Sequence, residues 1–154
     1  MYEKHTKFMK MALGEAKKAG QKAEVPIGAV LVSNSGDILS LSHNQTISLA
    51  DPTAHAEIIT LRKAAQKVSN YRLLNTTLYV TIEPCIMCMG AIVHARVSRV
   101  VFGAKDPKWG AAGSLYNFAN DTRLNYSPDI VHSVCEDECR TLIQEFFRSR
   151  RIKE

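Results

Sequence analysis

Two short segments restrict the fold of this chain more than any other part of its sequence. They are His55-Ala56-Glu57 and Pro84-Cys85-Ile86-Met87-Cys88, which lie about thirty residues apart, each near the expected start of a helix. Cys85 and Cys88 are three residues apart, so on a helix their sulfur atoms would lie on one face and bind one metal ion. A fold that uses both segments has to bring two thiols, an imidazole and a carboxylate together.

A lone Cys-x-x-Cys pair is also typical of a redox dithiol or of half a structural zinc knuckle. The first requires a thioredoxin-like context and the second another Cys-x-x-Cys or a histidine pair, and the sequence contains neither. The remaining thiols, Cys135 and Cys139, fall on the apolar stripe of the expected last helix with Leu142 and Phe146, so we expect them in the core. His55 is then the best third ligand. Two thiolates and one imidazole leave the fourth position of zinc open for water, as in catalytic sites.

Glu57 is the candidate for proton transfer at this site. A single glutamate is usually a solvated helix residue, but its place beside His55, with the cysteine pair downstream, indicates a catalytic role. Residues two apart on a regular helix point to nearly opposite sides, which would separate Glu57 from His55. The conflict is removed if the ion lies off the helix end and the first turn is irregular. We therefore expect the Glu57 carboxylate to lie beside the metal-bound water.

The order of the expected elements predicts an α/β fold with a mixed sheet of five strands flanked by helices. Helices are expected at 3–19, from Asp51-Pro52-Thr53 to Ala65, from Pro84 to about Ala95 and from Glu136 onward, and strands at 27–32, 38–43, 78–82, 99–103 and, more weakly, 130–134. The turn Asn34-Ser35-Gly36-Asp37 predicts an antiparallel hairpin. The later strand, helix, strand order predicts a right-handed crossover and a parallel pair.

The charge and the chain ends bear on partners and location. The formal net charge is +5, and the sequence ends in a basic stretch that includes Arg148, Arg150 and Arg151. Such a stretch can contact nucleic acid, although arginines at a helix end also suit the helix dipole. The longest nearly apolar run, 86–93, is far too short to span a membrane, and no secretory segment opens the chain. We expect a single domain in the cytoplasm, where thiols stay reduced.

The pairing of His-Ala-Glu with Pro-Cys-x-x-Cys resembles the signature of zinc-dependent nucleobase deaminases. The resemblance is closer to the bacterial tRNA-specific adenosine deaminases, and it covers nearly the whole chain. The segments that carry it are Asp51-Pro52-Thr53-Ala54-His55-Ala56-Glu57, Leu78-Tyr79-Val80-Thr81, Glu83-Pro84-Cys85, Gly103-Ala104-Lys105-Asp106-Pro107-Lys108, Gly110-Ala111-Ala112-Gly113-Ser114-Leu115 and the ending Phe146-Phe147-Arg148-x-Arg150-Arg151.

This resemblance implies a three-layer cytidine-deaminase-like fold in one domain, 1–154. It implies a homodimer with one zinc ion per subunit that converts adenosine to inosine at the wobble position of a tRNA anticodon. His55, Cys85 and Cys88 would hold zinc, which lowers the pKa of bound water to about 7, and Glu57 would move the protons. Asn44 would hydrogen-bond the target base. Contacts to the anticodon stem-loop would come from the 106–114 loop, with Asp106 and Lys108, and from the last helix, with Phe147, Arg148, Arg150 and Arg151.

The sequence departs from the family pattern at two places near these contacts. Asn44 is followed by Gln45 and Thr46, where the family often has an arginine and a proline. Trp109 stands in the 106–114 loop where a small or polar residue is usual. A tryptophan there would either stack on an RNA base or pack against a partner subunit.

Two other functions compete with this one. A free-base deaminase of the same superfamily, for example one that acts on guanine, shares the metal-site segments. The 104–114 segment and the arginine-rich end fit an RNA-acting enzyme instead, and a free-base deaminase has no need of Arg148, Arg150 and Arg151. A zinc-stabilised RNA-binding module without catalysis would need no Glu57 and would close the fourth zinc position with a protein ligand. His94 is the residue to check for that role.

Overall fold

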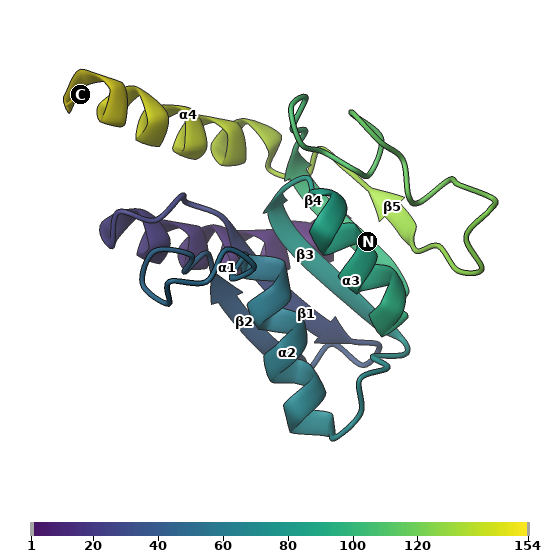
Figure 1. Ribbon diagram of the computed structural model, residues 1–154. Coiled ribbons are helices and arrows are strands. Elements are labelled where there is room, and N and C mark those ends of the chain that lie inside the picture. Colours follow the sequence, from purple (N-terminus) through teal and green to yellow (C-terminus); the bar gives the residue numbers. More distant parts are fainter. Residues whose placement is uncertain (1, 154) are drawn as a thin grey trace.

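A computed structural model describes residues 2–153 of the chain as one five-stranded sheet with helices on both faces (Figure 1). The elements are α1 (Tyr2–Gln21), β1 (Gly28–Ser33), β2 (Ile38–His43), α2 (Ala56–Val68), β3 (Thr76–Ile82), α3 (Ile86–Ala95), β4 (Arg99–Ala104), β5 (Asp129–Val131) and α4 (Glu136–Lys153). Within this part of the chain, no helix is both long and apolar enough to cross a membrane.

The sheet is mixed, with strand order β2-β1-β3-β4-β5. β1 pairs antiparallel with both β2 and β3, while β3 pairs parallel with β4 and β4 pairs parallel with β5. The hairpin and the parallel crossover through α3 are therefore confirmed. The hairpin turns at Gly36, whose φ of 90° is a conformation that favours glycine.

The sheet separates two hydrophobic cores and gives the fold three layers. Alternate side chains of a strand point to opposite faces, so Ala29 and Leu31 pack with α2 and α3, whereas Val30 and Val32 pack with α1 and α4. Figure 1 shows α2 and α3 together on one face of the sheet. The predicted α/β, three-layer architecture is confirmed.

Cys139 lies in the core, as expected. It is 1% exposed, and burial raises the pKa of its thiol to about 12. A Cβ atom on Gly103 would meet the Cys139 sulfur at 2.4 Å, so the bare backbone of β4 lets α4 pack closely. Cys135 differs from the expectation, because it precedes α4 with a positive φ of 53° and lies half-buried at the edge of the same core.

The predicted starts of two helices are wrong. α2 begins at Ala56, not at Asp51, because the Asp51 carboxylate accepts hydrogen bonds from the Thr53 amide and hydroxyl and thereby closes a local turn. α3 begins at Ile86, not at Pro84, and the Pro84 carbonyl instead accepts a hydrogen bond from Ala111.

The fifth strand is shorter than predicted. It covers Asp129–Val131 rather than 130–134, and two residues later Ser133 takes a positive φ of 66°, which a regular strand does not allow.

Candidate active site and metal centre

Two of the expected metal ligands occupy equivalent positions at the N-termini of α2 and α3. His55 is the N-cap residue of α2 (φ −72°, ψ 156°), and Cys85 is the N-cap residue of α3 (φ −76°, ψ 177°). Both backbones are extended, so these side chains lie in front of the helix ends instead of along the helix sides. Helix N-termini favour negative charge, which suits a thiolate ligand.

The three ligand atoms have the spacing that one zinc ion requires. The His55 Nδ1 atom lies 3.7 Å from the Cys85 sulfur and 3.5 Å from the Cys88 sulfur, and all three atoms lie within 4.8 Å of one another. In a tetrahedral site with Zn–S near 2.3 Å and Zn–N near 2.0–2.1 Å, the N···S separation is about 3.6 Å. The residues present therefore fit zinc, and His55 presents Nδ1 to it.

The surroundings prepare one thiol for ionisation. A hydrogen bond with Cys88 lowers the pKa of the Cys85 thiol to about 4, despite the opposing effect of burial. The same contact, together with burial, raises the pKa of Cys88, which is fully buried. A hydrogen bond with Cys85 raises the pKa of His55.

Glu57 lies inside this cluster and not on the outer face of α2. It is the second residue of α2, it is 3% exposed, and its carboxyl group lies beside the Cys88 thiol. Burial raises its pKa to about 7. His55 and Glu57 do not point to opposite sides because His55 stands outside the helix. The position of His55 in front of the helix end therefore removes the conflict without an irregular first turn.

Asn44 fixes the start of α2. It is 6% exposed, and its Oδ1 atom accepts a 2.7 Å hydrogen bond from the Ala56 amide. Capping of this kind stabilises a helix by about 1 kcal/mol. Because Asn44 directly follows β2, it ties the end of that strand to the residues beside the metal centre. Among residues 2–151, no hydrogen bond from its Nδ2 atom is found.

The 106–114 loop lies against the segment that carries Cys85. The Ala111 amide donates to the Pro84 carbonyl at 2.8 Å, and Gly110 forms an isolated β-bridge with Cys85. Asp106 shapes the loop, since its Oδ1 atom accepts hydrogen bonds from the Lys108 and Trp109 amides. The Lys108 side chain is exposed, and Trp109 is 65% exposed.

The basic end of α4 is placed by one of its own arginines. Arg150 donates a hydrogen bond to the Ala23 carbonyl, and its guanidinium lies 5.0 Å from the centre of the Phe146 ring. Arg148 and Arg151 are exposed, and Phe147 is 44% exposed. Since Lys10 of α1 also contacts Glu138 of α4, the two helices run in the same direction, side by side.

Two buried glutamates hold the loops beside the site, and the sequence did not predict either role. Glu24 is fully buried, and its carboxylate accepts hydrogen bonds from the Ile47 and Ser48 amides, which hold the loop after Asn44. Burial alone would raise the pKa of Glu24, but the hydrogen bonds from Ser48 and Ile47 outweigh it and lower that pKa. Glu83 holds the other loop in a similar way. The only sequence signal is an acidic residue next to an apolar strand.

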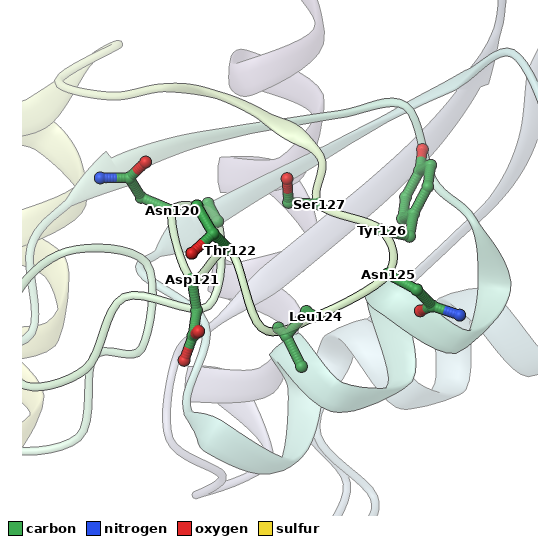
Figure 2. A pocket seen from close by; sticks show the side chains of 8 residues that line it. Asn120, Asp121, Thr122, Leu124, Asn125, Tyr126 and Ser127 are labelled. Carbon is green, nitrogen blue, oxygen red and sulfur yellow. The ribbon is translucent and has the colours of Figure 1, made fainter.

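Two surface hollows lie apart from these residues. Figure 2 shows the first, of about 240 Å³, within the loop 119–127. Two of its polar side chains have local partners, since Asp121 pairs with Arg123, and Tyr126 donates to the Val97 carbonyl at 2.7 Å. The second, of about 260 Å³, is a mainly apolar groove between α2 and α3. Neither hollow is lined by His55, Cys85 or Cys88.

His94 does not complete the metal site. It is exposed near the C-terminal end of α3, where it lines the apolar groove. Among residues 2–151, the metal-ligand cluster contains only His55, Cys85 and Cys88. A site closed by a fourth protein ligand therefore has no support in the described structure.

The fold and ligand set agree with comparisons to known proteins. The sequence pattern of the cytidine and deoxycytidylate deaminase zinc-binding region matches residues 2–104, which include the complete metal centre and Glu57. Fold, ligands and match together define the class of zinc-binding nucleobase deaminases.

The similarity extends beyond this region. A tRNA-specific adenosine deaminase of Haemophilus influenzae is 49% identical over 145 residues, which are 94% of this chain and 84% of the relative. A solved structure from a study of A-to-I editing by tRNA:A34 deaminases at the wobble position of transfer RNA superposes with a TM-score of 0.86. It is 44% identical, over 89% of this chain and 99% of that one. The chain belongs to the tRNA-specific adenosine deaminase family.

A guanine deaminase of Bacillus subtilis is similar over a smaller part. Its TM-score is 0.61 at 38% identity, and the match covers 64% of this chain and 63% of that one.

Proposed function

We propose that this chain hydrolyses adenosine to inosine at the wobble position of a tRNA anticodon. The observation that carries the proposal is the buried Glu57 carboxylate beside a His, Cys, Cys zinc site, in a chain 49% identical to a tRNA-specific adenosine deaminase. The reaction adds water at C6 of adenine and releases ammonia, so it needs no oxidant or reductant.

The residues divide this chemistry among them. His55, Cys85 and Cys88 would hold zinc, which would supply a Lewis acid that lowers the pKa of a water molecule to about 7. Glu57 accepts a proton from the attacking water and passes it to N1 of the ring. It then takes the proton of the new C6 hydroxyl group and delivers it to the C6 amino group, which leaves as ammonia while the C6 carbonyl forms. Burial raises the pKa of Glu57 from its ordinary value towards the neutral range, in which a carboxyl group can both accept and return protons.

The target base would be held by Asn44, whose Nδ2 atom is the donor left over after Oδ1 caps α2. An anticodon base already lies in a loop, so moving it into the site costs less than flipping a base from a duplex. Lys108 and the exposed arginines of α4 would contact the stem-loop backbone, while Asp106 would shape the loop that presents Lys108.

Arg148→Ala combined with Arg151→Ala should weaken binding of an anticodon stem-loop. Each lost phosphate contact should reduce the slope of log K against log salt by roughly 0.7 to 0.9, which a titration at several salt concentrations measures. Arg150→Ala tests a third expected RNA contact that also donates a hydrogen bond to the Ala23 carbonyl; a loss of thermal stability with an unchanged slope would limit Arg150 to holding α4. An unchanged slope in the double variant would assign the exposed arginines to the helix dipole.

We propose that Trp109 stacks on an RNA base next to the target. It is 65% exposed and precedes Gly110, the residue paired with Cys85. Stacking on an aromatic side chain contributes about 1–3 kcal/mol per base, so Trp109→Ala should weaken stem-loop binding by roughly 5- to 150-fold. The stem-loop should also quench tryptophan fluorescence. If the tryptophan fluorescence changes when the protein is diluted, but does not change when RNA is added, Trp109 packs against a partner subunit instead.

We propose that two copies of the chain form a homodimer in the cytoplasm. The apolar groove between α2 and α3 supports pairing, since Tyr71, which lines it, is 65% exposed. All four cysteines are free thiols, which suits a reducing compartment. Sedimentation at micromolar concentration should give twice the mass of one chain, whereas the mass of one chain would refute pairing.

The substrate class can be tested by incubating the zinc-loaded protein separately with tRNA, guanine and cytosine. We expect ammonia release only with tRNA. Release with guanine, but not with tRNA, would favour the free-base deaminase, and tRNA binding without any release would favour the binding module.

A further inference from the structure

Glu83 is a buried carboxylate that the proposed chemistry does not use. It is 3% exposed and stands between the end of β3 and Pro84, two residues before the metal ligand Cys85. No lysine or arginine pairs with it among the residues whose side chains the structure describes. A buried charge without a cation needs several hydrogen bonds to persist.

The 106–114 loop supplies those hydrogen bonds. One carboxylate oxygen of Glu83 accepts from the Asp106 amide at 3.1 Å and from the Ser114 hydroxyl. The other oxygen accepts from the Ala112 and Ser114 amides, each at 3.0 Å. All four donors belong to one loop, and they come from both of its ends and its interior. The loop is therefore wrapped around a single carboxylate.

Close packing reinforces this arrangement at Gly110. A Cβ atom there would lie 2.4 Å from the Glu83 carboxyl carbon and 2.5 Å from the Asp106 carbonyl oxygen. The loop backbone thus rests directly on the carboxylate. The bridge from Gly110 to Cys85 attaches the same part of the loop to the metal-binding segment.

We propose that Glu83 is a positioning residue that fixes the 106–114 loop relative to the metal centre. By holding the loop it sets where Lys108 and Trp109 meet the substrate. This inference rests on the proposed function, because it assigns that loop to RNA. A carboxylate is required since it has two acceptor oxygens, whereas an amide would place its own N–H groups against the donors of the loop.

Trp109 makes the inference directly measurable, because it is the only tryptophan of the chain and lies in this loop. In Glu83→Gln, tryptophan anisotropy should fall and quenching by acrylamide should rise. The KM for an anticodon stem-loop should increase roughly tenfold, as expected for the loss of hydrogen bonds to a charged group, with kcat changed far less. Zinc content should stay at one ion per chain.

Two further variants keep the test decisive. Ser114→Ala removes one donor of the four and should shift fluorescence and KM in the same direction by a smaller amount, even if Glu83→Gln does not fold. Val134→Ala, a truncation of a fully buried core residue outside the loop, should lower thermal stability without changing either signal.

Unchanged anisotropy and KM in Glu83→Gln would overturn the inference, as would a loss of zinc that accounts for the activity change. The fluorescence comparison needs no turnover. Failure of the proposed function and failure of the positioning role are therefore distinguishable.

Discussion

Glu57→Gln is expected to abolish most of the turnover while zinc content and stem-loop affinity stay unchanged. Glutamine has nearly the same shape and fits the same buried position, but it cannot accept a proton from water or return it to the base. Proton transfer by a positioned side chain typically contributes 10²- to 10⁴-fold, so kcat should fall by about that factor. Single-turnover inosine formation with saturating protein measures the chemical step without interference from binding.

Glu3→Gln is the matched control, because Glu3 is an exposed glutamate of α1 and lies in no part of the proposed site. It should retain the full rate. If Glu57→Gln retained deamination with zinc present, the assignment of proton transfer to Glu57 would be wrong.

Cys88→Ser should remove both the metal and the activity. Cys88 is fully buried, and its sulfur lies 3.5 Å from the His55 Nδ1 atom, so its loss leaves zinc with two protein ligands. A hydroxyl does not ionise as a thiol does and is a poor ligand for zinc in proteins. We expect less than one tenth of an ion per chain by elemental analysis, with inosine formation at background.

Cys135→Ser is the control for the thiol change. Cys135 is the half-buried cysteine outside the metal centre, and its variant should bind one zinc ion and retain activity. Zinc bound normally by Cys88→Ser would show that another group holds the metal.

The two cysteine ligands were predictable from sequence because their spacing is local, and His55 followed once Cys135 and Cys139 were expected in the core. Two thiols three residues apart need only one helical turn to meet, and the downstream helix brings them to His55. The helix starts were less predictable. Asp51-Pro52-Thr53 has the composition of a cap, but Asp51 closes its own turn, and the actual cap of the Ala56 amide comes from the distant Asn44.

The roles of Glu24, Glu83 and Arg150 could not be predicted, since each depends on partners far along the chain. Glu83 accepts hydrogen bonds from residues 23 to 31 positions away, and Arg150 donates one to the Ala23 carbonyl 127 positions away. From the neighbouring residues alone, one would predict a solvent-exposed acidic or basic side chain at these positions. The burial of Glu24 and Glu83 follows only from the tertiary structure, in which the loops pack around them.

The most direct test of the central claim uses an anticodon stem-loop, zinc-loaded protein and water enriched in ¹⁸O. After the product is digested in ordinary water to short oligonucleotides, mass spectrometry of the fragments should find inosine at the wobble adenosine alone, with one ¹⁸O atom in each inosine and one ammonia released per inosine. A wobble adenosine that stays unchanged, or inosine that carries no label, would contradict hydrolytic deamination of tRNA at this metal centre.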